Sequence, residues 1–291
     1  MNISQHLTVP AARFPTRVAL VDADDPGGRK SWTYADLWQR VRRVAGGLAA
    51  RRLKKGDRVA LLLPNSREYV ESFLGIAAAG MVAVPMNIRL LEAEMLHMLR
   101  DSGARLLIAQ DALFAGREAL LSVPELGVAV MRATAALQKP KFAFESLADA
   151  PPADPVESAP GDLSSLMYTS GTTGLPKGVM LSHGAWNAVS DATRRYLDYG
   201  HGQGEVTLHA APLTHGAGFL LLPTLAAAGT NVVVTRFEPG RILRLMREER
   251  VTNGFLVPSM IQMLLDEPDT VLDTASGGLP DLKTLYYAGS P

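Results

Sequence analysis

Short apolar runs alternate with helical patterns along the chain, and this alternation restricts the fold more than any other feature of the sequence. In the first half, such runs occupy residues 18–21, 59–63, 81–84 and 106–108. Neighbouring positions within each run are apolar, so both faces of the corresponding strand would be buried. Parallel strands covered by helices on both sides have this property. The sequence therefore predicts an α/β fold with mainly parallel sheets flanked by helices.

Amphipathic helices are expected between these runs. One helix begins at residues 33–36, a Thr-Tyr-Ala-Asp sequence that has the form of a capping box, and Leu37 and Val41 start its apolar face. Further helices are expected at residues 68–79 and 91–100. Each of them lies between two predicted strands, as the connections of a parallel sheet require.

A polar, proline-rich stretch at residues 148–161 can continue neither a helix nor a strand, because proline lacks the amide N–H that both need. We therefore expect a first α/β subdomain over residues 1–160, ending in this linker, and a second over residues 161–291. Strand-like runs resume in the second part at residues 166–168, 206–208, 232–234, 255–257 and 285–287.

Residues 206–235 contain no Asp, Glu, Lys or Arg and are numerous enough to raise the alternative of a membrane span. The stretch is interrupted by helix- and strand-breaking residues, namely Pro212, Gly216, Gly218, Pro223 and Gly229. This spacing instead favours a strand, a short helix and a second strand inside a buried core.

Charge and cysteine content narrow the classes of function. The 29 basic and 29 acidic residues give a formal net charge of zero, which favours neither nucleic acid nor an anionic membrane as a partner. The chain has no cysteine, so any thioester that it makes must use a sulfur atom from a substrate. Residues 1–20 lack the apolar core of a signal peptide, so we expect a cytoplasmic protein.

Four hydroxyl residues, three glycines and a lysine gather directly after the predicted strand at residues 166–168. The motif consists of Tyr168, Thr169, Ser170, Gly171, Thr172, Thr173, Gly174, Leu175, Pro176, Lys177 and Gly178. Glycines let backbone N–H groups approach an anion, hydroxyls donate hydrogen bonds, and the lysine supplies a mobile positive charge. The spacing is not that of a Walker A loop or of a Rossmann glycine motif. The composition favours a phosphate-binding loop, with a polar turn between strands as the alternative.

The motif resembles the signature of the adenylate-forming superfamily, which includes AMP-forming acyl-CoA synthetases, peptide-synthetase adenylation domains and firefly luciferase. Further segments are similar to the family in the right order, at residues 32–37, 79–87, 212–215 and 288–291. The resemblance therefore covers essentially the whole chain. It implies an enzyme that joins a carboxylic acid to ATP as an acyl-adenylate, releases pyrophosphate and passes the acyl group to coenzyme A.

The resemblance also implies roles for individual residues. The phosphates of ATP would be held by Thr169, Ser170, Gly171, Thr172, Thr173, Gly174 and Lys177, and the adenine would lie along Gly289, Ser290 and Pro291. Magnesium is the expected metal, but the family places its ligands beyond residue 291. No metal ligand and no catalytic residue is therefore assigned within the chain.

An acyl pocket is implied around His215, Gly216, Ala217 and Gly218. A structural, hydrogen-bonded histidine is the alternative role for His215. The expected pocket segment, residues 206–235, offers no carboxylate for the ammonium group of an amino acid, and burying that group unpaired is costly. An uncharged acyl chain or an aryl acid is therefore the favoured substrate class.

The family continues beyond the Gly-Ser-Pro at residues 289–291 with further site residues and a small C-terminal domain. We therefore expect residues 1–291 to be an N-terminal part, incomplete at the C-terminus and inactive alone. Two alternatives stay open, namely a non-catalytic nucleotide-binding module and another adenylate-forming ligase. Homo-oligomerisation is compatible with either.

Overall fold

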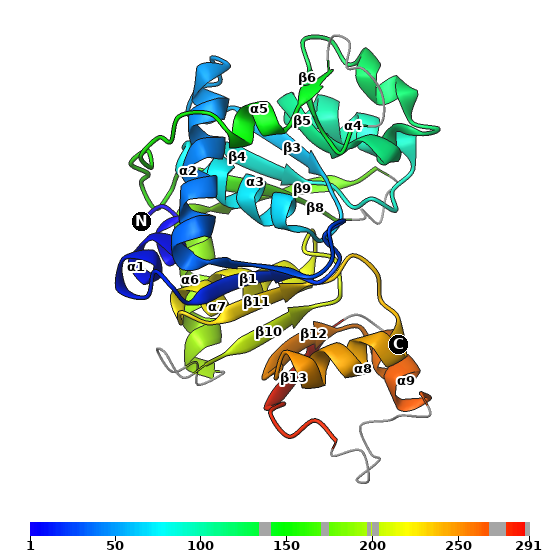
Figure 1. Cartoon of the computed structure of the whole chain (residues 1–291). Coiled ribbons are helices and arrows are strands. Elements are labelled where there is room, and N and C mark those ends of the chain that lie inside the picture. Colours follow the sequence, from blue (N-terminus) through cyan, green and yellow to red (C-terminus); the bar gives the residue numbers. More distant parts are fainter. Residues whose placement is uncertain (134–140, 170–174, 197–198, 200–203, 268–277, 289–291) are drawn as a thin grey trace. The chain divides into compact units, whose positions relative to one another are not determined.

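The computed structural model forms two compact units (Figure 1). It describes residues 1–133, 141–169, 175–196, 199, 204–267 and 278–288. Unit 1 consists of residues 1–5, 36–64 and 68–188, and unit 2 consists of residues 6–35, 65–67 and 189–291. The predicted linker at residues 148–161 thus belongs to unit 1, where Ala153 N donates to Arg42 O and Val156 N donates to Ala78 O. A domain boundary at residue 160 remains a prediction.

Unit 1 contains a seven-stranded sheet with the order β7-β6-β5-β3-β4-β8-β9, in which only β9 is antiparallel to its neighbour. Its strands are β3 (Arg58–Leu62), β4 (Val82–Pro85), β5 (Ala104–Gln110), β6 (Gly127–Met131), β7 (Lys141–Ala143), β8 (Leu163–Thr169) and β9 (Lys177–Ser182). The helices that lie wholly or mostly in this unit are α2 (Tyr34–Ala50), α3 (Arg67–Ala78), α4 (Glu92–Ser102) and α5 (Glu145–Ala148). Helix α6 (His183–Tyr196) begins in this unit. The short 3-10 helices η1 (Asp111–Phe114) and η2 (Glu118–Ser122) follow β5.

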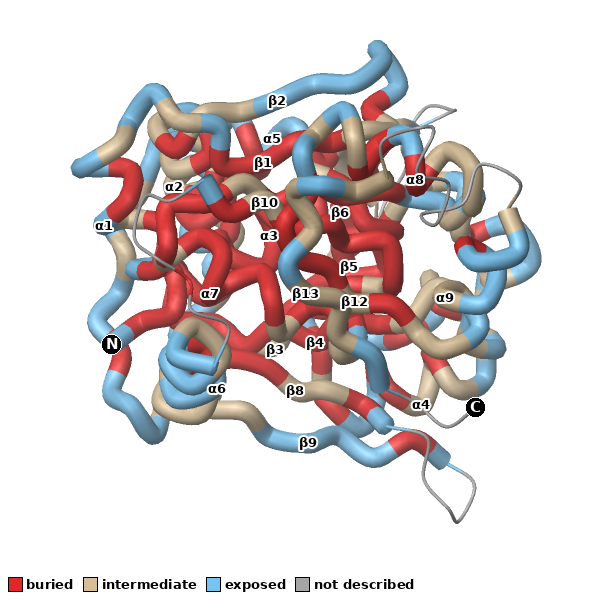
Figure 2. The backbone as a smooth tube through the Cα atoms, turned by 90° about the horizontal axis from the view of Figure 1, so that it is seen from below, coloured by how far each residue is buried: buried red, intermediate tan, exposed pale blue. Residues whose placement is uncertain are grey.

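The core of unit 1 follows from the apolar strands. One face of the sheet contributes every second residue of the central strands to a cluster with Met95, Met98 and Leu99 of α4. The alternate residues, such as Leu61 and Ile108, are buried as well. The central strands are accordingly buried along their length, whereas β9 at the end of its sheet is mostly exposed (Figure 2). The expected burial of both strand faces is confirmed.

Unit 2 contains a six-stranded sheet with the order β13-β12-β10-β11-β1-β2, in which only β2 is antiparallel. Its strands are β1 (Val18–Asp22), β2 (Lys30–Thr33), β10 (Val206–His209), β11 (Thr230–Val233), β12 (Asn253–Leu256) and β13 (Thr284–Tyr287). Its helices are most of α1 (Gln5–Arg13), then η3 (Gly216–Leu220), α7 (Leu221–Ala226), α8 (Pro239–Glu248) and α9 (Pro258–Leu265). Ile242, Leu243 and Met246 of α8 pack on apolar residues of β1, β10 and β11.

Residues 206–235 form a strand, a short helical segment and a second strand, as predicted. Within the part of the chain that the structure describes, no helix is long and apolar enough to cross a membrane. The mixed α/β class with mainly parallel sheets is confirmed in both units.

Candidate functional site

The predicted phosphate motif lies at the junction of β8 and β9 in unit 1. These strands pair antiparallel, and Thr169 at the end of β8 is the direct partner of Lys177 at the start of β9. Both residues are exposed to solvent. The pairing brings a hydroxyl and an ammonium group from the two ends of the motif to neighbouring positions. Ser170, Gly171, Thr172, Thr173 and Gly174 lie outside the described residues.

An open pocket of about 460 Å³ adjoins this junction. It is lined by His97, Asp101, Leu175, Pro176, Lys177 and Gly178. His97 and Asp101 come from α4, and the sequence pattern did not single them out. Isolated polar residues on an amphipathic helix carry no signal of this kind, because they usually face solvent.

Two hydrogen bonds join α4 to the motif. His97 Nε2 lies 3.0 Å from the carbonyl oxygen of Pro176, and the hydroxyl of Tyr168 donates to Asp101 Oδ2 at 2.5 Å. Burial raises the pKa of Tyr168, and the neighbouring carboxylate of Asp101 raises it further. The Tyr168 hydroxyl is therefore protonated at neutral pH and acts as the donor.

The predicted acyl-pocket residues lie in unit 2, directly after β10. His215 is exposed, but partial desolvation lowers the pKa of its ring. Gly216 packs against the ring of Phe255, where an added Cβ would lie 2.9 Å from Cζ. Ala217 is fully buried. A Cβ on Gly218 would lie 2.3 Å from the carbonyl oxygen of Leu213, so the backbone approach itself requires glycine there. A substrate pocket at these residues remains a prediction.

Asn65 holds the segment that leads to His215. Its side-chain Nδ2 donates to the carbonyl oxygens of His209, at 3.0 Å, and Ala211, at 2.9 Å. Its Oδ1 accepts the N–H of Leu213 at 2.8 Å. One buried amide thus satisfies three backbone groups of residues 209–213. The sequence pattern did not single out Asn65, although a polar residue placed soon after an apolar run could have suggested it.

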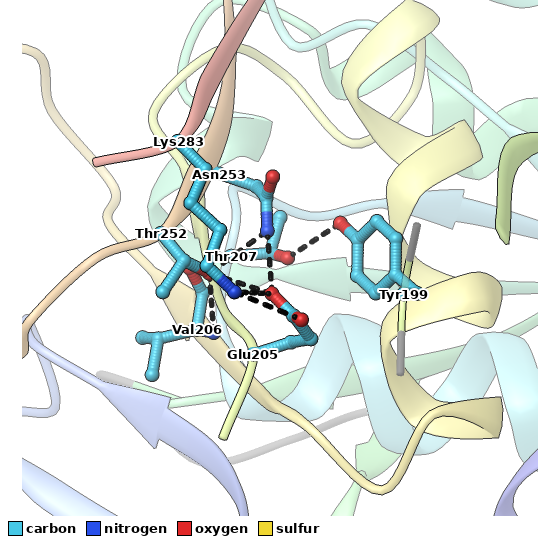
Figure 3. A network of polar contacts seen from close by, with 7 residues as sticks. All are labelled: Tyr199, Glu205, Val206, Thr207, Thr252, Asn253 and Lys283. Carbon is cyan, nitrogen blue, oxygen red and sulfur yellow. Dashed lines mark hydrogen bonds and ion pairs between the residues drawn. The ribbon is translucent and has the colours of Figure 1, made fainter. Parts of the chain in front are cut away.

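A buried carboxylate, Glu205, is the centre of the polar network shown in Figure 3. Glu205 accepts hydrogen bonds from Thr252 Oγ1 and Asn253 Nδ2, both at 3.1 Å, and pairs with Lys283 Nζ at 3.2 Å. Nearby, Tyr199 shares a hydrogen bond with Thr207. Clusters of this kind can mark an active site.

The position of the Glu205 network argues for a structural role instead. Glu205, Thr252 and Lys283 each precede the first residue of a parallel strand, namely β10, β12 and β13. Ligands of open α/β sheets bind at the carboxyl ends of the strands, whereas this network lies at their amino ends. The network therefore fixes the starts of three strands.

His183 and His209 are fully buried, and both have structural partners. His183 Nδ1 accepts the N–H of Ile3 at 3.2 Å, and His209 Nε2 bonds to Asn231 Oδ1 at 2.7 Å. Burial lowers the pKa of both rings to about 4. Both rings are therefore neutral at physiological pH.

No described residue belongs to a metal-binding group of three or more His, Asp or Glu side chains. The predicted adenine-binding residues Gly289, Ser290 and Pro291 lie outside the described residues, just after β13.

Comparison with known proteins identifies relatives of this chain. A feruloyl-CoA synthase of Amycolatopsis sp is 40% identical over 270 residues, which cover 91% of this chain and 50% of that protein. The long-chain-fatty-acid–CoA ligase FadD13 of Mycobacterium tuberculosis is 30% identical over 291 residues, or 100% of this chain and 56% of that protein. The chain thus spans about half the length of the curated relatives it matches.

A solved structure shows the same fold. The N-terminal domain of FACL13 from Mycobacterium tuberculosis superposes with a TM-score of 0.85 at 27% identity, covering 100% of this chain and 70% of that one. The sequence profile described as AMP-binding enzyme matches residues 7–291. With the motif at the β8–β9 junction, this match shows that the chain belongs to the AMP-binding enzyme family.

Proposed function

We propose that this chain contributes to the ATP-dependent activation of a carboxylic acid to an acyl-adenylate and the transfer of the acyl group to coenzyme A. The observation that carries the proposal is the family match over residues 7–291, together with the position of its phosphate motif between two paired strands. The relatives named above are CoA synthases and ligases. Because the chain spans about half of their length, the proposal concerns the whole enzyme in which these residues act.

In this function, Lys177 and Thr169 would bind phosphate oxygens of ATP together with Ser170, Gly171, Thr172, Thr173 and Gly174. An ammonium group forms charge-assisted hydrogen bonds to phosphate, and a hydroxyl adds a neutral donor. Such donors help most when they are held in place before charge develops on the leaving pyrophosphate. Gly289, Ser290 and Pro291 would contact adenine, and magnesium would enter as the complex with ATP.

For the acyl group, we propose an uncharged aryl or aliphatic acid bound near His215. An aryl acid of the ferulate kind comes first, because the relatives at 40% identity are named feruloyl-CoA synthases, whereas those at 30% identity are long-chain fatty acid ligases. His215 would line the pocket. Its replacement by Ala should then change the order of preference among acids and leave the KM for ATP unchanged.

The direct test is carboxylate-dependent exchange of labelled pyrophosphate into ATP, with ferulate, medium-chain and long-chain acids as substrates. It should be run on residues 1–291 and on any longer reading frame that contains them. We propose that residues 1–291 alone exchange pyrophosphate slowly, because in-line displacement also needs charge stabilisation at the α-phosphate. ATP binding without any exchange, in either form, would instead favour a nucleotide-binding module.

Lys177→Ala should raise the KM for ATP about tenfold or more, as expected for the loss of one charged hydrogen bond worth about 1.5 to 3 kcal/mol. The matched control is Lys54→Ala, which removes an exposed lysine from the turn before β3. Equal ATP kinetics in the two variants would remove Lys177 from the site. A cytoplasmic location and homo-oligomerisation stay part of the proposal, to be tested by fractionation and sedimentation.

A further inference from the structure

One face of α4 reaches both ends of the phosphate motif. His97 and Asp101 are four residues apart on this helix, so their side chains lie above one another on the same face. His97 meets Pro176, which directly precedes Lys177. Asp101 meets Tyr168, which directly precedes Thr169. A single helix therefore contacts the neighbour of each described phosphate-binding candidate.

The chemistry of the two hydrogen bonds fixes their direction. A carbonyl oxygen can only accept, so the bond to Pro176 requires a proton on Nε2 of His97. A carboxylate can only accept, so the Tyr168 hydroxyl is the donor to Asp101. Because Thr169 and Lys177 are paired across β8 and β9, each bond restrains both of these residues.

The helix itself is firmly held. Met95, Met98 and Leu99 are buried in the core of unit 1. The first turn is closed by the bond from Leu91 N to Glu94 Oε2, and the last turn ends at Gly103 in the left-handed conformation, with φ of 59°. A support of this kind can fix the positions of the groups that it contacts.

We propose that α4 positions the phosphate-binding residues Thr169 and Lys177, with His97 and Asp101 as its two positioning residues. This inference rests on the proposed function, since it assigns the two side chains a part in ATP binding. Neither side chain needs to touch the nucleotide. Each acts through a bond to the residue beside a phosphate-binding candidate.

The first experiment measures, without nucleotide, how well the backbone amides of β8 and β9 are protected from hydrogen exchange. Backbone hydrogen exchange is followed in peptides that cover β8 and β9, for His97→Leu and Asp101→Ala. Loss of either bond should speed exchange there about threefold to tenfold, as expected for one hydrogen bond. His97→Gln keeps an N–H donor and Asp101→Asn keeps an acceptor, so both should restore most of the protection. Arg100→Gln, at an exposed position of the same helix, is the control.

The second experiment measures pyrophosphate exchange in the longest active form of the enzyme. His97→Leu and Asp101→Ala should raise the KM for ATP about threefold to tenfold and leave the KM for the acid unchanged, and the Gln and Asn variants should be close to wild type. If His97 and Asp101 only stabilise the fold, their replacement would lower the amount of active protein without raising the KM for ATP relative to the KM for the acid. Such a result overturns the inference, as does unchanged hydrogen exchange in β8 and β9.

The two proposals fail separately. If the wild-type enzyme neither binds ATP nor exchanges pyrophosphate, the proposed function is refuted, and with it the part of the inference that concerns ATP. If the wild-type enzyme is active and the Leu and Ala variants match it in both experiments, the inference alone is refuted.

Discussion

Removal of the Glu205 side chain should destabilise unit 2 by an amount that its partners determine. The carboxylate is almost completely buried and accepts from Thr252, Asn253 and Lys283. After Glu205→Ala, Asn253 Nδ2 keeps its bond to Thr252 Oγ1 at 2.8 Å, and Thr252 Oγ1 keeps the carbonyl oxygen of Val206 at 3.1 Å.

Half of the Lys283 side chain is exposed, so its ammonium group can turn to water. The cost of Glu205→Ala is then two lost hydrogen bonds and a small cavity, about 2 to 3 kcal/mol, which is less than that of breaking a fully enclosed ion pair. Glu205→Gln keeps the volume and one acceptor and should cost about 1 kcal/mol. Lys283→Met removes a partly exposed partner and should cost up to about 1 kcal/mol.

Urea unfolding of the three variants and the wild type, monitored by circular dichroism, measures these differences in the free energy of unfolding. The expected order of destabilisation is Glu205→Ala first, then Glu205→Gln and Lys283→Met. If Glu205→Ala lies within about 0.5 kcal/mol of the wild type, a value typical of surface substitutions, the network does not hold the strand starts together. The Glu205 network would then have no structural role at the starts of β10, β12 and β13.

Three further predictions concern stability. In the folded chain, His183 and His209 have pKa values of about 4, whereas a histidine in the unfolded chain has a pKa of about 6.5. Between these two pH values the unfolded chain therefore binds more protons than the folded chain. The free energy of unfolding should therefore fall as the pH drops from about 6.5 to about 4, by about 3 kcal/mol from His209 alone, and His209→Gln should flatten this urea-unfolding profile. Gly218→Ala should cost about 1 to 3 kcal/mol, because the new methyl group meets the Leu213 carbonyl at 2.3 Å, and an unchanged melting temperature would contradict that contact. Asn65→Leu leaves three backbone groups without their amide partner and should lower the free energy of unfolding in urea by about 2 to 3 kcal/mol. An unchanged value would show that Asn65 does not hold residues 209–213 in place.

The sequence predicted most of the buried strands because they consist of consecutive apolar residues, although the equally apolar β6 (Gly127–Met131) was not predicted. Of the strands at the sheet ends, it predicted β13 through the run at residues 285–287 but missed β2, β7 and β9. In β2, residues Lys30–Thr33 are mostly polar and exposed, and their strand conformation follows from pairing with β1. In β9, Val179 and Met180 are apolar but exposed, so their strand conformation does not come from burial in a core. Helix α1 also escaped prediction, because Pro10 inside it argues against a helix.

The phosphate-binding role of the motif stays a prediction from its residue types. The hydroxyls, glycines and lysine of the motif indicate phosphate by themselves, and the structure adds that Thr169 and Lys177 are strand partners. His97 and Asp101 could not be found in this way, since only the packing of α4 brings them to the motif. For Gly218, the sequence suggested space for a substrate, whereas the structure shows a backbone approach that requires glycine.

The order of strands in unit 2 has a consequence for how the chain is made. Strand β1 occupies an interior place between β2 and β11, and Leu20 pairs with Asn231, about 210 residues later in the chain. During synthesis, β1 leaves the ribosome long before its parallel neighbour β11 exists. The apolar residues of β1 remain without this neighbour during the synthesis of the about 210 residues between Leu20 and Asn231, which at about 5 to 20 residues per second takes about 10 to 40 seconds. Over that interval the apolar residues of β1 lack their later partner, which makes this segment a candidate for chaperone binding.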